Sequence, residues 1–296
     1  MVKIDRVVVF CSPRDAHLAE ICIASIRYWN STIQIDLHKD ESRKKFSTFD
    51  IERFFNVNLC DSSKSSVGNP MSKFYYVTKG ADIITGENLL VLDADTAWFG
   101  NVEELFEHEP NSLELIVQGE MHPSKEWMKR KYFDSELFYA LHPELSLPSF
   151  VFNSGHFLIK VGSIHFDESQ GLLTSDSLDT IDGIFPFDQG LFNFIHAQRQ
   201  ATRSIKSKSL EIAKWSGHQI DFSREKSDPF ILHWAGRSHL PESMMDYAEQ
   251  LLRYRKFISS QYKFPTFYFF TYRLKMALQV FLYHIRRVRL RILGKK

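Results

Sequence analysis

Two carboxylates stand close together after an apolar run in the first third of the chain. The segment LLVLDADTAWF delivers Asp93 and Asp95 to a turn at the end of a predicted strand. Carboxylates spaced in this way can share one hard divalent cation through oxygen ligands. Such a cation can bridge a diphosphate and stabilise the charge that builds on it as a sugar leaves. The alternative is a pair of solvated turn residues or helix caps.

A histidine at the end of a later strand could complete the same site. His233 ends the apolar run of FILHWAGRSHLP, and a glycine follows three residues later. An imidazole with two carboxylates suits Mn²⁺ or a similar first-row ion better than calcium. A lone histidine at a strand end is more often packed or solvated. Its combination with the Asp-x-Asp turn is what predicts a metal site.

Strands and helices alternate along the chain. The predicted strands cover residues 7–10, 33–37, 88–92, 115–118, 150–159 and 230–234, and the predicted helices cover 16–29, 71–79 and 244–258. The opening β-α-β order predicts an α/β fold in which helices cover a parallel sheet. Open sheets of this kind bind ligands at the carboxyl ends of their strands, which is where Asp93 and Asp95 stand.

Charge and cysteine content divide the chain and indicate its compartment. Of the 37 Lys and Arg residues, nine lie in residues 263–296 with no acidic residue, which leaves 28 basic against 36 acidic side chains before them. We therefore predict a catalytic domain over residues 1–261 and a basic aromatic tail over 262–296. The three cysteines show no CxxC spacing and predict free thiols in a reducing compartment. The first apolar run is too short for a signal peptide and is interpreted as a core strand.

Four motifs in a fixed order carry a family resemblance. LDADTAWFGNVEELF, FNSGHFLI, FPFDQGLFN and ILHWAG resemble the retaining GT-A glycosyltransferases of the glycogenin and lipopolysaccharide galactosyltransferase type, glycosyltransferase family 8. The resemblance covers about residues 1–240. It implies the GT-A fold, a single Rossmann-like nucleotide-binding domain with a mixed, mostly parallel sheet flanked by helices. Here that domain would carry a basic, amphipathic, helical C-terminal extension.

The resemblance implies a role for each residue that matches the family pattern. Asp93, Asp95 and His233 would hold Mn²⁺, or Mg²⁺, and the metal would grip the diphosphate of a UDP-sugar. Asp188 would orient hydroxyls of the donor sugar, and the Gln189 carbonyl would stabilise positive charge on its β face. The other donor-binding residues would be Phe10, Ser12, Asp15, Lys73, Ala94, Asn153, Ser154, Gly155, Gly236 and Arg237. Among these, the loop over residues 10–15 would cover the base and ribose.

Several of these residues have a plainer interpretation. Lys73 stands where many relatives have arginine and would lack its bidentate fork, or it is a solvated helix lysine. Residues 153–155 form a bend that allows close backbone approach, or a simple β-bulge. Asp188 could instead cap the helix that follows it. His239 replaces the lysine of the relatives' HxxGxxKPW motif, which leaves the clamping of phosphate open.

The tail over residues 263–296 mixes aromatic and basic side chains. Such a segment could lie in a membrane interface with its cations toward anionic head groups. Arg273 and Lys275 break the apolar run well before the roughly 20 residues that a membrane span needs. The alternative is a helix packed on the catalytic domain. Nucleic acid binding is disfavoured, since the rest of the chain is acidic and contains no recognised binding module.

Together these features predict an enzyme that transfers galactose or glucose from its UDP form to a glycan or lipid-linked glycan acceptor. Configuration would be retained by same-face attack, with the leaving phosphate accepting the proton. A cytoplasmic protein, bound peripherally to the inner face of the membrane and acting in polysaccharide biosynthesis, fits the tail. One alternative is an inverting enzyme with Asp188 as base. Another is a noncatalytic, membrane-peripheral protein that binds nucleotide sugars, which Lys73 and His239 favour.

Overall fold

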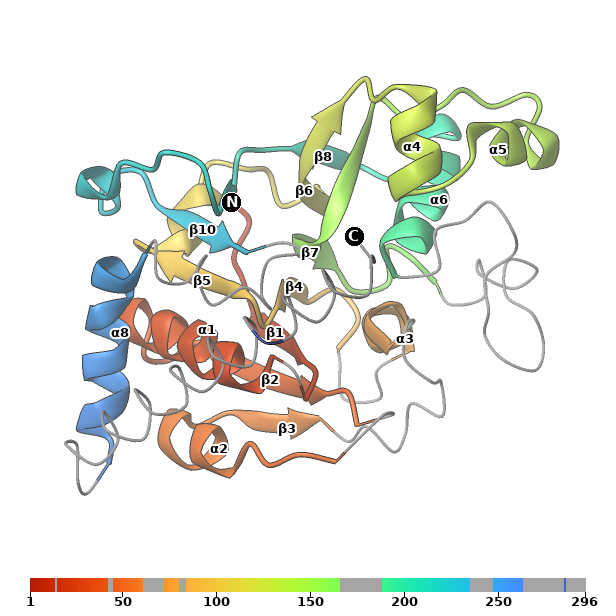
Figure 1. Ribbon diagram of the computed structural model, residues 1–296. Helices are drawn as coiled ribbons and strands as arrows, with labels where there is room; N and C mark the ends of the chain where they lie inside the picture. The colour runs from red at the N-terminus through yellow and green to blue at the C-terminus, as the bar shows by residue number, and fades with distance from the viewer. Residues whose placement is uncertain are drawn as a thin grey trace.

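The computed structural model describes residues 1–13, 15–41, 45–60, 72–79, 84–165, 188–234, 247–262 and 285. Within these ranges two sheets are flanked by helices (Figure 1), which confirms the predicted α/β fold. Gly236, Arg237 and His239 lie outside the described residues. The tail predicted over 263–296 also lies outside them, apart from residue 285. None of the described helices combines the length and the apolar character needed to cross a bilayer.

The larger sheet is mixed but mostly parallel. In spatial order its strands are β3 (Asn58–Cys60), β2 (Gln34–Lys39), β1 (Arg6–Cys11), β4 (Asn88–Asp93), β7 (Phe150–Lys160), β6 (Leu115–Met121) and β8 (Ser207–Ser209). The first four strands run parallel to one another, β7 is antiparallel to both β4 and β6, and β8 is parallel to β6. The runs RVVVFC and NLLVLD form central strands because their side chains are buried on both faces of the sheet.

The smaller sheet carries the second half of the predicted site. Its strands, in spatial order, are β5 (Thr96–Phe99), β10 (Phe230–His233) and β9 (Ala213–Trp215). β5 follows β4 after a two-residue turn, so the chain passes from one sheet into the other at the Asp-x-Asp motif. β10 is antiparallel to β5 with His233 opposite Thr96, and the backbone N–H of Trp234 donates to the carbonyl of Asp95 at 3.0 Å. This pairing brings the end of β10 to the end of β4.

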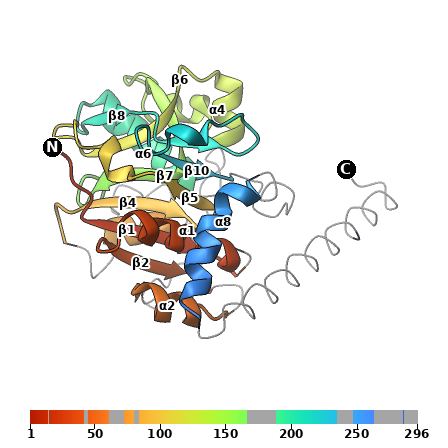
Figure 2. The ribbon, with the colours of Figure 1, turned by 90° about the vertical axis from the view of Figure 1, so that its left-hand side faces the viewer.

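Helices cover both faces of the larger sheet and define two cores. One face carries α1 (Ala16–Trp29), α2 (Phe49–Phe55) and α8 (Ala248–Ser260), and the other carries α3 (Ser72–Lys79), α4 (Lys125–Lys131), α5 (Ser135–Leu141) and α6 (Asp188–Ala201). Along β1, Val7 and Val9 point into the first core and Val8 into the second, as the alternation of a strand requires. Figure 2 shows α8 beside α1. Two short 3₁₀ helices, η2 (Val102–Leu105) and η4 (Phe222–Arg224), complete the described elements.

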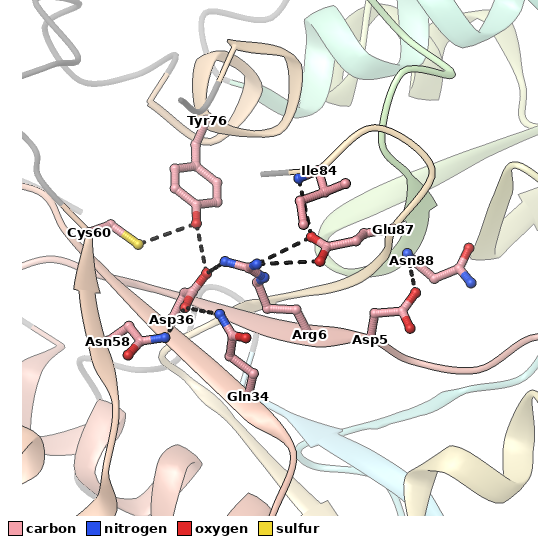
Figure 3. A network of polar contacts seen from close by, with 10 residues as sticks. All are labelled: Asp5, Arg6, Gln34, Asp36, Asn58, Cys60, Tyr76, Ile84, Glu87 and Asn88. Carbon is pink, nitrogen blue, oxygen red and sulfur yellow. Dashed lines mark hydrogen bonds and ion pairs between the residues drawn. The ribbon is translucent and has the colours of Figure 1, made fainter. Parts of the chain in front are cut away.

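A buried polar network ties α3 to the parallel strands (Figure 3). We call it the Asp36 network; it consists of Arg6, Gln34, Asp36, Asn58, Tyr76 and Glu87. The carboxylate of Asp36 accepts hydrogen bonds from Arg6 at 2.7 Å and from the Tyr76 hydroxyl at 3.0 Å. Tyr76 lies on α3 one turn after Lys73. The network therefore sets the position of the helix that carries this candidate site residue.

Candidate active site

The three predicted metal ligands gather where the two sheets meet. Asp93 ends β4, Asp95 precedes β5 and His233 ends β10, and each offers a ligand atom within 4.8 Å of the others. Nε2 of His233 lies 3.4 Å from Oδ1 of Asp95. His233 is buried, whereas the Asp93 side chain keeps 36% of its surface exposed, so the cluster opens to solvent at Asp93. We call these three residues the Asp93 cluster.

The backbone of Gly155 approaches this cluster so closely that no side chain would fit. A Cβ there would lie 2.3 Å from Cε1 of His233 and 2.8 Å from Oδ2 of Asp93. The imidazole and this carboxylate oxygen therefore face the same space beside Gly155. Burial alone would raise the pKa of Asp95, but His233 and Lys73 hold it below its ordinary value. Two charged carboxylates and an imidazole fit Mn²⁺, and the carboxylates also suit Mg²⁺.

Lys73 neutralises the other oxygen of Asp93. Its Nζ lies 2.6 Å from Oδ1 of Asp93 and donates to the carbonyl of Ser154 at 2.7 Å. The lysine is buried, with only 6% of its surface exposed, so the interpretation as a solvated helix residue is wrong. Because Lys73 engages Oδ1, the second oxygen of Asp93 is the one left for a cation beside His233.

A β-bulge places the Asn-Ser-Gly segment at the site. Val117 of β6 pairs with Phe157 of β7 and Gly119 pairs with Phe152, so residues 153–156 stand opposite Gln118 alone. Bulges bend a strand and redirect its side chains, and they are frequent beside active sites. With four residues opposite one, the register shift is larger than that of a simple β-bulge, and the segment also makes a close backbone approach. The close approach is to Asp93 and His233.

Asp188 begins α6 and contacts α3. Its Oδ1 accepts a hydrogen bond from the backbone N–H of Phe74 at 2.9 Å, in the first turn of α3. Burial raises the pKa of Asp188 to about 7, although Lys73 and the Phe74 N–H act in the opposite direction. The carboxylate therefore lies next to the lysine that holds Asp93.

Gln189 bridges the bulge and α4. Its Oε1 accepts from Nδ2 of Asn153 at 3.1 Å, and its Nε2 donates to the carbonyl of Lys131 at 3.0 Å. One turn later, the buried Asn193 exchanges two hydrogen bonds of 2.8 Å with the backbone of Phe152. Asn193 thereby fixes α6 to the start of the bulge. It was not predicted from the sequence, where a single amide within LFNFI is its only signal.

A second buried histidine contacts the proposed ligand His233. Nδ1 of His156, on β7, lies 3.0 Å from Nδ1 of His233. Burial lowers the pKa of His156 well below its ordinary value, so the ring is neutral. Trp215 packs against both imidazoles, with ring centroids 5.2 Å from His156 and 5.1 Å from His233. His156 was also not predicted, and a lone polar residue in the run HFLI is its only sequence signal.

The remaining predicted donor-binding residues lie at or near the carboxyl ends of β1 and β4. The Ala94 N–H donates to the carbonyl of Phe10 at 3.0 Å, and Nζ of Lys73 lies 5.8 Å from the centre of the Phe10 ring. Ser12 donates to the carboxylate of Asp15 at 2.6 Å. Phe10, Ala94 and Lys73 thus adjoin Asp93, while Ser12 and Asp15 are bound to each other just before α1.

A pocket of about 540 Å³ adjoins Asn153 and Gln189. Its lining residues are Gln118, Gly119, Glu120, Trp127, Lys131, Tyr132, Asn153, Gln189 and Trp215. Trp215 connects the pocket to His233, and Trp127 of α4 donates a hydrogen bond to Glu120. The aromatic residues of this pocket were not predicted: Trp127 and Tyr132 lie in residues 124–148, which show no pattern that can be interpreted from sequence alone, and Trp215 lies outside the four motifs.

An open, mostly parallel sheet with a polar site at its strand ends belongs to the class of nucleotide-binding α/β folds. No family model and no curated protein matches the sequence. Among solved structures, the bifunctional glycosyltransferase WbbM superposes with a TM-score of 0.53 at 11% identity, covering 86% of this chain and 52% of that one. The galactosyltransferase LgtC, in complex with donor and acceptor sugar analogs, has a TM-score of 0.51 at 14% identity, covering 86% and 95%.

These likenesses confirm the predicted GT-A fold, which the four sequence motifs implied. The chain spans about half the length of the WbbM chain and nearly all of the LgtC chain. At such low identities the likeness establishes the fold alone. Function must then be argued from the site itself.

Proposed function

We propose that the chain is a glycosyltransferase that moves galactose or glucose from a UDP-sugar to a glycan or glycolipid acceptor, with a divalent metal and with retention of configuration. One observation carries the proposal: Asp93, Asp95 and His233 converge within 4.8 Å at the carboxyl edge of a GT-A sheet. Mn²⁺ or Mg²⁺ held there would stabilise negative charge on the departing diphosphate. Lys73 adds a second positive charge at the same place.

Asp188, Gln189 and the bulge residues form the sugar side of the proposed site. Asp188 is bound to the start of α3, and Gln189 is held by Asn153 at the pocket wall. In this proposal Asp188 orients donor hydroxyls, and the Gln189 carbonyl stabilises positive charge at the reacting carbon. Hydrogen bonds at both ends of the Gln189 amide keep its carbonyl in one orientation, which lowers the cost of reorganisation during transfer.

The pocket beside Gln189 supports a glycan acceptor. Trp127, Tyr132 and Trp215 provide aromatic walls, and Gln118 and Glu120 provide polar groups. In pockets that combine apolar walls with a few polar groups, the walls hold a small ligand and the polar groups orient it. A sugar ring has both kinds of surface, C–H faces and hydroxyl edges. Its reactive hydroxyl would enter the site next to Gln189.

An inverting reaction is the second candidate, and the state of Asp188 favours it. A general base works best when its pKa lies near the working pH, and burial raises the pKa of Asp188 to about 7. Asp188 would then take the proton of the acceptor hydroxyl. NMR of the product separates the two reactions: an α-linked donor gives an α-linkage by retention and a β-linkage by inversion.

Attachment to an anionic membrane surface is also part of the proposal. Its support is the tail over residues 263–296, with nine basic residues and no acidic one. Such a segment would bring the enzyme to a lipid-linked acceptor at the inner face of the membrane. Flotation of the full chain with vesicles of anionic and of neutral lipid tests it. Equal flotation with both would contradict an electrostatic attachment.

The experiment that tests the function is a panel of nucleotide sugars scored by UDP release, with and without Mn²⁺ and with a mixed glycan acceptor pool. Metal-dependent release from one UDP-sugar is the expected result and names the donor. Binding of UDP-sugars without any release would instead support the noncatalytic binding protein. If no UDP-sugar binds, the donor assignment is wrong.

A further inference from the structure

His156 is buried in the sheet and makes one side-chain hydrogen bond among the described residues. Its Nδ1 lies 3.0 Å from Nδ1 of His233. Its Nε2 is buried and has no hydrogen-bond partner in the described part of the chain. An unpaired polar atom in a core lowers stability, and an apolar ring would fill the same volume without one. The contact with His233 is therefore what a histidine adds at this position.

The chemistry of a metal-binding imidazole explains this contact. A neutral imidazole carries one proton on its two ring nitrogens, so a nitrogen that binds a cation must leave the proton on the other. Nε2 of His233 is the nitrogen that faces Asp95, at 3.4 Å from its carboxylate. The proton must then lie on Nδ1, which needs an acceptor because it is buried. Among the described residues, Nδ1 of His156 lies at hydrogen-bond distance to supply it.

We propose that His156 is a positioning residue for the metal site. It accepts the Nδ1–H of His233 and so presents the free Nε2 of that ligand to the cation beside Asp93 and Asp95. Trp215 packs on both rings and limits their rotation. Partners of metal-binding histidines are usually carboxylates, carbonyls or water, and here a second imidazole takes that place. The inference rests on the metal site of the proposed function.

Two substitutions of nearly equal size separate the hydrogen bond from the packing. His156→Asn places an amide oxygen where Nδ1 stood and keeps an acceptor, whereas His156→Leu removes it. His196→Leu is the matched control, because His196 is also fully buried, with one nitrogen bound to Ser207 at 2.9 Å and the other without a partner among the described residues. His196 lies on α6, away from the Asp93 cluster.

The measurement is Mn²⁺ affinity in the presence of UDP, followed by the electron paramagnetic resonance signal of free Mn²⁺. We expect His156→Leu to weaken binding about 10- to 100-fold, the usual effect of losing the partner of a ligand. His156→Asn should bind within about threefold of the wild type, and His196→Leu should bind as the wild type does. Thermal denaturation without metal shows what each change does to folding.

Equal Mn²⁺ affinity of His156→Leu and the wild type would overturn the inference and leave the proposed function intact. Equal weakening by the asparagine and leucine variants also overturns it, because packing alone would then explain the effect. A wild-type protein that binds no divalent cation with UDP would overturn the metal site and this inference together. Nitrogen-15 NMR gives a second readout: with Mg²⁺ and UDP bound, Nδ1 of His233 should be protonated, and a proton on Nε2 would contradict the proposal.

Discussion

The Asp36 network lies on the larger sheet and the Asp93 cluster lies where the two sheets meet, and the two polar groupings differ in what supplies the partners of their side chains. The carboxylate of Asp36 accepts from four side chains of the chain itself, Arg6, Gln34, Asn58 and Tyr76. The Asp93 cluster instead directs two carboxylates and an imidazole at a space that Gly155 keeps clear. The Asp36 carboxylate is thus occupied by donors of the chain itself, whereas the Asp93 cluster is arranged to receive a ligand.

The difference shows how one fold combines stability with binding. A buried network of hydrogen bonds rigidifies the structure, while the ligand atoms of Asp93 and His233 that face the space beside Gly155 remain available to a cation. Helix α3 connects the two, because Tyr76 joins the Asp36 network and Lys73 pairs with Asp93. We therefore expect changes in the Asp36 network to reduce stability, and changes in the Asp93 cluster to reduce metal binding and transfer.

The largest effect is expected from Asp95→Asn, which keeps the shape of the side chain and removes a ligand charge. Sugar transfer should fall on the order of a thousandfold, because a metal stabilises several kcal/mol of transition-state charge. Asp95 is a cleaner target than Asp93, whose loss would also strip buried Lys73 of its ion pair. The measurement is kcat for UDP release, with Asp50→Asn on the surface of α2 as control. Full activity of the Asp95 variant would remove the assigned metal role.

Asp36→Ala should produce the largest loss of stability. Removing one partner of a buried ion pair costs about 3 to 5 kcal/mol; here the Tyr76 hydroxyl loses its acceptor and Arg6 keeps only the more distant carboxylate of Glu87. Urea denaturation measures the change in the free energy of unfolding. The control is Glu41→Ala, which removes a more exposed ion pair of 2.9 Å with Lys39 and should cost less than about 1 kcal/mol. Similar losses of unfolding free energy in both variants would contradict the greater contribution assigned to the Asp36 network.

Gly155→Ala should distort the Asp93 cluster, because the added methyl group has no room beside it. The added carbon would force His233 and Asp93 apart, and a displacement of about 1 Å can reduce catalysis about a hundredfold. Mn²⁺ affinity and kcat should fall together. Gly86→Ala is the control, because Gly86 has a positive φ of 94° but open space around its would-be Cβ. A Gly155 variant with unchanged Mn²⁺ affinity would show that the cluster tolerates the methyl group.

Trp127→Ala tests whether the pocket beside the cluster receives the acceptor. Loss of an aromatic wall should raise the acceptor KM about tenfold, which corresponds to about 1.4 kcal/mol. The KM of the UDP-sugar should change less than about twofold, since Trp127 lines the pocket and is not one of the metal ligands. The acceptor KM of Trp127→Phe should lie between that of the wild type and that of Trp127→Ala. An equal rise in both KM values would place the tryptophan on the donor side.

Asp188 is expected to make the stability of the folded chain depend on pH. Burial raises its pKa to about 7, so between about pH 4 and 7 the folded chain holds a proton that the unfolded chain has released. This residue therefore lowers stability as the pH rises through that window. Asp188→Asn should become more stable relative to the wild type from pH 4.5 to 7.5 in urea denaturation. Parallel pH profiles would contradict the raised pKa.

Local patterns predicted the central strands and helix α1, but not the short helices α2, α4 and α5 or the short strands β3, β5, β8 and β9. The helix predicted over residues 16–29 coincides with α1 (Ala16–Trp29), because its apolar periodicity needs no distant partner. The strand predicted over 115–118 extends to Met121 in β6, since Gly119, Glu120 and Met121 pair with β7 although they lack an apolar run. Pairing across a sheet can thus extend a strand beyond its local signal.

Only those residues of the site that lie within a sequence motif could be predicted. Asp93 and His233 follow apolar strands and can be found in the sequence, but the pairing of β5 with β10 that joins them is not local. The contacts of His156 with His233 and of Asp188 with α3 link residues far apart in the chain. Such contacts depend on the packing of whole elements. No spacing within a single segment reveals them.

Pulsed electron paramagnetic resonance of Mn²⁺ bound to the wild-type protein with UDP tests most directly whether His233 binds the metal. We predict two couplings on the same ion, one to ¹⁴N from the imidazole of His233 and one to ³¹P from the diphosphate. The ¹⁴N coupling should disappear in His233→Ala, while the ³¹P coupling remains on any Mn²⁺ carried by UDP. A wild-type spectrum with phosphorus coupling and no nitrogen coupling would contradict the account, because the metal would then be bound to the nucleotide without His233.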